Sequence, residues 1–134
     1  MSRIVKNLVL FVIVFHVAAF VVEAFLWMRP VVHEPMLRHL TGAVDVSPRD
    51  QAAILRSLFV NQGFYNLFLA IGTGVGVVGV ARDWEPQGST LVVFGCLFMI
   101  GAALVLVVAR PRMARAAAIQ GVLPLLALLA ALIW

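Results

Sequence analysis

The sequence has few charged side chains for its length. Charged residues make up 12% of its 134 residues, and hydrophobic residues make up 63%. Soluble globular domains are typically about 25% charged and about 45–50% apolar. A chain with so little charge lacks the polar side chains that a water-facing surface needs. The composition therefore predicts an integral membrane protein, and the length suits one domain over residues 1–134.

Cysteine is nearly absent, and Cys96 is the only one. A single cysteine excludes an internal disulfide framework and any paired-cysteine redox or zinc motif. Between Phe94 and Leu97, it is predicted to be a small packing residue. His33 and His39 are six residues apart and do not share a helix face, so we expect two solvated loop histidines. No metal and no cofactor is predicted.

The net charge of +4 raises the question of nucleic acid, but the basic residues flank apolar runs instead of forming a stripe. Such placement is typical of membrane topology, in which Lys and Arg gather on the cytoplasmic side. This rule predicts a multi-pass protein of the cell membrane with the 29–50 loop and the 110–112 turn in the cytoplasm and both termini outside. On the predicted cytoplasmic side are Arg29, Arg38, Arg49, Arg56, Arg110, Arg112 and Arg115, and on the other Arg3, Lys6 and Arg82.

Four apolar runs are long enough to cross a bilayer, for which about 20 residues suffice. They predict an all-α transmembrane bundle with a polar loop, residues 29–50, between its first two helices. Pro30 disfavours helix at Arg29 and ends the first run. Within the loop, residues 35–43 are typical of a short interfacial helix, and residues 47–50 have the Ser-Pro-x-Asp pattern of a helix start. The predicted spanning helices cover about residues 4–28, 51–80, 90–109 and 113–133.

The second apolar run ends in closely spaced glycines. Residues 74–79 match a GxGxxG string, but no strand precedes it, so we exclude a dinucleotide site. Gly72 and Gly76 form a GxxxG pair, which lets another helix approach the backbone closely. That helix belongs either to the same chain or, as a sharper alternative, to a homo-oligomer or a larger membrane complex.

The polar residues within the apolar runs indicate where function lies. Residues 61–66 contain three carboxamides and a phenol. These groups are costly in a membrane unless other buried groups form hydrogen bonds with them. A rise of about 1.5 Å per residue places polar residues of the first, second and fourth spanning helices in the same half of the bilayer. We therefore predict a polar ligand-binding pocket between these helices, with Arg56 near Glu23 at its mouth. Its predicted residues are His16, Glu23, Trp27, Asn61, Gln62, Tyr65, Asn66 and Gln120.

Several functions are compatible with this cluster. The favoured hypothesis is a protein of the lipid bilayer that binds or carries a small or lipidic ligand. Alternatives are a hydrogen-bond network that only locks the bundle, and an accessory subunit of a larger membrane complex. A membrane enzyme using His16 and Glu23 as an acid/base pair is less favoured, because the sequence has no HExxH motif, nucleophile elbow or Cys–His arrangement.

Three motifs resemble one known family. His16 followed by Glu-Ala-Phe-Leu-Trp-Met at 23–28 is similar to its His-then-Glu-x-Phe-x-Trp signature. Asn-Gln-Gly-Phe-Tyr-Asn-Leu-Phe-Leu-Ala at 61–70 and Gln-Gly-x-x-Pro at 120–124 resemble its other two conserved blocks. The family is that of the small bacterial and fungal four-helix membrane proteins with domain of unknown function 1304. The resemblance covers nearly the whole chain and implies the four-helix fold, but no particular activity.

Overall fold

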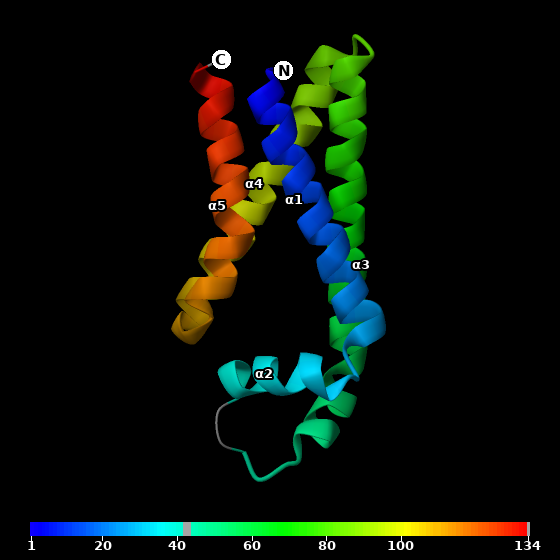
Figure 1. The fold of residues 1–134 in the computed structure, drawn as a ribbon, viewed down its shortest axis with the longest axis vertical. Coiled ribbons are helices and arrows are strands. Elements are labelled where there is room, and N and C mark those ends of the chain that lie inside the picture. Colours follow the sequence, from blue (N-terminus) through cyan, green and yellow to red (C-terminus); the bar gives the residue numbers. More distant parts are fainter. Residues whose placement is uncertain (42–43, 134) are drawn as a thin grey trace.

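Four long helices form an antiparallel bundle, and a short helix lies across one end of it (Figure 1). The computed structural model describes residues 1–41 and 44–133, and every regular element in them is helical. Both termini lie at the end opposite the short helix. The elements are α1 (Arg3–Val21), a π-helical turn η1 (Val22–Leu26), α2 (Pro30–Leu40), α3 (Pro48–Ala81), α4 (Glu85–Ala109), a 3-10 turn η2 (Pro111–Met113) and α5 (Ala114–Ile133).

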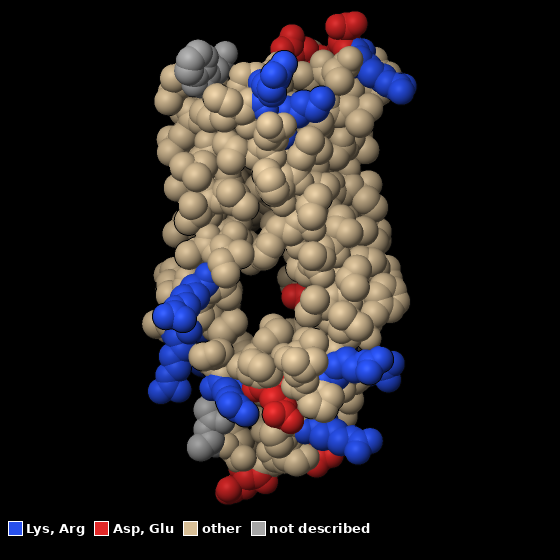
Figure 2. Space-filling view, in the orientation of Figure 1, with Lys and Arg blue, Asp and Glu red and all other residues tan. Residues whose placement is uncertain are grey.

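The four long segments confirm the predicted transmembrane bundle. Each is long and apolar enough to span a membrane, with a mean hydropathy between 1.7 and 3.0. Even the shortest, Pro111–Ile133 with 23 residues, exceeds the roughly 20 residues that a bilayer requires. Basic residues gather at the two ends of the molecule, with an uncharged band between them (Figure 2).

Two spanning helices begin earlier than their apolar runs. α3 starts at Pro48, because Ser47 caps it by accepting a hydrogen bond from the Asp50 backbone nitrogen at 3.2 Å. α4 starts at Glu85 within the residues predicted as a loop, because Pro86 suits the first turn of a helix. The predicted start of this helix at residue 90 therefore lay too far along the chain.

The bundle has a square arrangement in which each helix packs on two neighbours. α1 packs on α3 and α5, and α4 packs on the same two helices from the other side. The ends of α1 and α5 near the termini meet in an apolar cluster of buried Val5, Val9 and Ala127 with Cys96 of α4, which joins three helices in the termini half of the bundle. Cys96 is fully buried there, as expected of a packing residue.

Small residues set the contact between α3 and α4. A Cβ atom at Gly88 would lie 2.7 Å from the carbonyl oxygen of Gly76, and one at Gly79 would lie 3.2 Å from the Cα of Gly88. The two backbones thus touch through Gly76, Gly79 and Gly88 within one chain. Gly72, predicted to pair with Gly76, takes no part in this contact, since a Cβ built on it has nothing within 4 Å beyond its own helix turn. A contact between copies of the chain through Gly72 and Gly76 stays a prediction.

The predicted loop over 29–50 is partly helical. α2 begins at Pro30, earlier than the expected interfacial helix over 35–43, because Pro30 itself provides the first helical position after the extended Arg29. Residues 42 and 43 of that expected helix lie outside the described residues. α2 runs across the end of the bundle, with Leu37 buried and Arg38 exposed. It thereby covers the end of the bundle at which α1 turns back toward α3.

Candidate functional site

The half of the bundle near α2 is hollow. α1 and α5 diverge toward that end, and α2 lies beyond the space between them (Figure 1). The space-filling view shows an opening in the side of the molecule at this level, with an acidic side chain at its edge (Figure 2). The bundle is therefore open on this side near α2.

A hydrogen bond between two polar side chains joins α1 to α3 in this half. The Asn66 side-chain nitrogen donates to Oε2 of Glu23 at 2.7 Å. In the part of the chain that the structure describes, no other hydrogen bond joins side chains of two spanning segments. Both residues are half-buried, so neither is sealed from its surroundings. The pair provides a carboxyl and a carboxamide group at membrane depth, as the sequence predicted for these two residues.

Local backbone features bring Glu23 and Asn66 together. Glu23 lies in the π-helical turn η1, a feature frequent at functional sites because it re-aims side chains within a helix. Gly63 lets α3 approach this turn, since a Cβ atom there would lie 3.2 Å from the carbonyl oxygen of Phe20 and from the nitrogen of Ala24. Asn66 follows Gly63 by about one turn and so reaches the carboxyl group.

His16 lies two turns before Glu23 on α1 and is buried, with 1% of its surface exposed. Its Nδ1 is 2.9 Å from the carbonyl oxygen of Val12, which can only accept, so Nδ1 carries a proton. Nε2 is buried without a hydrogen-bond partner among the described residues. In the neutral ring this atom is an acceptor, and it lacks a donor.

Trp27, also predicted as a site residue, forms its contacts with other groups of the protein. Its indole nitrogen donates to the carbonyl oxygen of Ala52 at 2.8 Å, and its ring stacks on Phe59 with centroids 3.6 Å apart. Nδ1 of His33 lies 3.1 Å from the Trp27 carbonyl oxygen and donates to it. Trp27 thus ties the end of α1 to α2 and α3.

The histidine prediction for the loop was half wrong. His33 is buried, with 2% of its surface exposed, whereas His39 is exposed as expected. His33 is buried because α2 turns this face toward Trp27. The residues next to His33 in the sequence do not indicate that contact. Among the described residues no group of three metal-binding side chains comes together.

The remaining predicted residues separate into two sets. Asn61 lines an open groove on the outer side of α3 with Arg56, and no ion pair joins Arg56 to Glu23 in the described residues. Tyr65 is 58% exposed and lines a different groove, between α3 and α4. Gln62 is exposed but shares a helix stripe with Asn66, and Gln120 is half-buried on α5. The structure thus brings Glu23 and Asn66 together and places Asn61 and Tyr65 outside.

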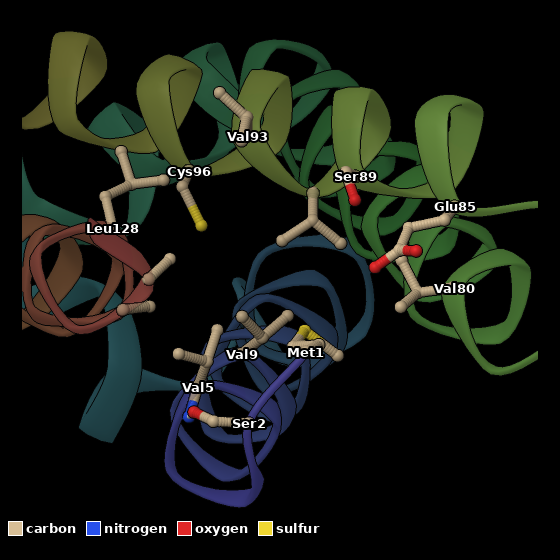
Figure 3. A pocket seen from close by; sticks show the side chains of 13 residues that line it. Met1, Ser2, Val5, Val9, Val80, Glu85, Ser89, Val93, Cys96 and Leu128 are labelled. Atoms are coloured by element: carbon tan, nitrogen blue, oxygen red, sulfur yellow. The ribbon is translucent and has the colours of Figure 1, made fainter. Parts of the chain in front are cut away.

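A second cavity, of about 270 Å³, lies at the termini end between α1, α4 and α5 (Figure 3). Its walls are mainly apolar, including Val5 and Val9, and Cys96 lies on its floor. Glu85 and Ser89 are its polar residues on α4. Glu85 lies in the first turn of α4, where a carboxylate stabilises the helix start, so a ligand is not needed to explain it. No sequence pattern indicates this cavity, because most of its lining is apolar.

Of the comparisons with known proteins, one finds a match. No curated protein and no solved structure matches the chain. A family model described as a protein of unknown function, DUF1304, matches residues 10–132. This match includes the Glu23–Asn66 pair and nearly all of the four spanning segments. The protein is therefore a multi-pass membrane protein that belongs to the DUF1304 family.

Proposed function

We propose that the protein binds or carries a small lipidic molecule whose polar group occupies the hollow beside Glu23 and Asn66. The observation that carries this proposal is the 2.7 Å hydrogen bond between these two half-buried side chains. A carboxyl group in a spanning segment is expensive, and such groups mark ligand or ion sites by default.

The chemistry of the site favours a ligand that donates hydrogen bonds. Glu23 offers carboxyl oxygens, and Asn66, whose nitrogen is already bonded to Glu23, offers its side-chain carbonyl oxygen. Both groups accept. An uncharged hydroxyl group costs less to place in a bilayer than an ammonium group. We therefore favour an amphiphile with a hydroxyl headgroup, which enters through the lateral opening (Figure 2).

Replacing Glu23 with glutamine tests this function. The amide keeps the size of the side chain and its bond to Asn66, but it replaces one carboxyl oxygen with an NH₂ donor. The ligand hydroxyl then faces a donor without an acceptor, and an unsatisfied buried group costs about 1–3 kcal/mol, so ligand retention should fall about tenfold. Native mass spectrometry of protein extracted gently from its own membrane measures the bound mass.

Asn61→Leu is the matched control, because Asn61 belongs to the same polar block but lines the outer groove. We expect it to retain the ligand at the wild-type level. A wild-type protein that carries no small molecule, or one found only in fixed stoichiometry with other polypeptides, would contradict the proposal. The second result would favour the accessory-subunit hypothesis.

We further propose that the protein lies in the cell membrane with α2 in the cytoplasm and both termini outside. Seven arginines belong to α2, its flanks and the α4–α5 turn, against three basic residues at the termini end. In a Cys96→Ala background, Ser2→Cys should react with an impermeant maleimide on intact cells. Asp45→Cys should react only after the cells are opened, and the reverse pattern would refute the orientation.

A further inference from the structure

A basic pocket lies between α2 and the turn that joins α4 to α5. It has a volume of about 230 Å³ and is lined by the C-terminal end of α2, including His39, and by residues Ala109 to Arg112 of the turn. The lining contains Arg110, Arg112 and His39 and no acidic residue. Each wall comes from a different part of the chain, so the pocket exists only when α2 lies across the bundle.

The positive charge of this pocket is not balanced by the protein. Within residues 1–41 and 44–133, the one ion pair joins Arg38 to Glu34 at 3.7 Å, which leaves Arg110 and Arg112 without a carboxylate. The helical segment that starts at Pro111 has no acidic residue in its first turn and no side-chain cap. Arg112 therefore lies at a helix start, where a cation is unfavourable, whereas Arg110 caps the C-terminus of α4, where a cation is favourable.

A separate apolar groove lies between the spanning helices α4 and α5. It has a volume of about 280 Å³ and runs between α4 and α5 from Val107 and Ala114 as far as Leu125. Val107 and Ala114 are each two residues from a residue that lines the pocket, Ala109 and Arg112 respectively. The groove is shallow and lined by small side chains such as Ala118, which leave room for an alkyl chain.

We propose that this pocket binds the phosphate of an anionic phospholipid, with an acyl chain in the groove between α4 and α5. The turn at 110–112 joins two spanning helices, so it lies at the depth of lipid headgroups. Two arginines match the geometry and charge of a phosphate group. The adjoining groove favours a lipid over free phosphate, which has no chain to place there. The bound lipid contacts both α2 and the α4–α5 turn and stabilises α2 in its place beneath the hollow.

The double variant Arg110→Gln with Arg112→Gln tests the headgroup site. The protein is reconstituted in nanodiscs of phosphatidylglycerol and phosphatidylcholine in equal parts and released for native mass spectrometry. Wild type should retain phosphatidylglycerol, and the double variant should retain at least about tenfold less, because two charge-assisted contacts are lost. The matched control, Arg49→Gln with Arg56→Gln, removes the same charge at the same end and should behave as wild type.

A third variant separates a lipid from a free anion. Ala118→Phe fills the groove but leaves both arginines in place, so it should also lower phosphatidylglycerol retention. Phosphatidylglycerol should raise the melting temperature of wild type but not of the double variant. Equal retention by the double variant and its control would overturn the site, and so would equal stabilisation by inorganic phosphate alone. Neither result concerns ligand retention at Glu23, so the two proposals fail separately.

Discussion

Trp27→Ala is expected to destabilise the protein by about 3–5 kcal/mol, the usual loss for a large aromatic side chain removed from a packed site. Trp27 is 1% exposed and forms a buried cluster with Leu37 and Ala52. The substitution removes the stack on Phe59 and leaves the Ala52 carbonyl oxygen without the indole donor. Unfolding by sodium dodecyl sulfate in mixed micelles, followed by circular dichroism, measures the change.

Trp27→Phe is the control for this prediction. It keeps an aromatic ring against Phe59 but loses the hydrogen bond to Ala52, which contributes about 0.5–1.5 kcal/mol net. We expect an intermediate stability. Cys96 provides a second readout, since it is the only thiol and is fully buried, so a maleimide labels it only after the bundle opens. A Trp27→Ala protein as stable as Trp27→Phe would show that the stacked ring contributes little.

Gly88→Ala is expected to cost about 1–3 kcal/mol or more, because one added methyl group overpacks the contact between α3 and α4. A Cβ atom at this position would lie 2.5 Å from the backbone nitrogen of Val80 and 2.7 Å from the carbonyl oxygen of Gly76. Both atoms belong to the backbone of α3 and cannot rotate away. The helices must separate, and the midpoint of detergent-induced unfolding should fall.

Gly101→Ala is the matched control on the same helix. No atom lies within 4 Å of a Cβ built at Gly101, so alanine there meets open space. Because alanine favours helix over glycine by up to about 1 kcal/mol, this variant should be neutral or more stable. We therefore expect the same glycine-to-alanine change to lower the stability at position 88 and to leave it equal or raise it at position 101. Equal midpoints for the two variants would mean that Gly88 does not set the helix contact.

The sequence was sufficient to predict the spanning helices but not which way their faces point. Length and hydropathy define a helix in a bilayer, and Ser47 with Pro48 defined the start of α3. The orientation of a face is usually read from the contrast between apolar and polar stripes. In lipid both the core and the outer surface are apolar, so this contrast is lost. Asn61 and Tyr65 were therefore predicted inside with Asn66, although they face outward.

The π-helical turn and the packing of α2 were beyond prediction for a related reason. The helix at Glu23 widens where α3 approaches through Gly63, which contacts Phe20 and Ala24, residues far from it in the sequence. His33 is buried by Trp27 and the packing of α2, not by any local pattern. Glu23 and Asn66 were both predicted as polar residues in the same half of the bilayer, but their pairing was not, because Arg56 was the expected neighbour of Glu23.

The position of α2 has a consequence for how a ligand would reach the hollow. α2 covers that end of the bundle, and the opening lies on its side, between the two ends (Figures 1 and 2). When the four spanning segments cross a bilayer, this side faces the acyl chains. A ligand must then dissolve in the bilayer before it binds. Occupancy will follow its mole fraction in the lipid phase, so the apparent Kd in aqueous units will rise as more lipid is added. Compounds with a low partition coefficient will bind weakly, however well they fit the polar pair.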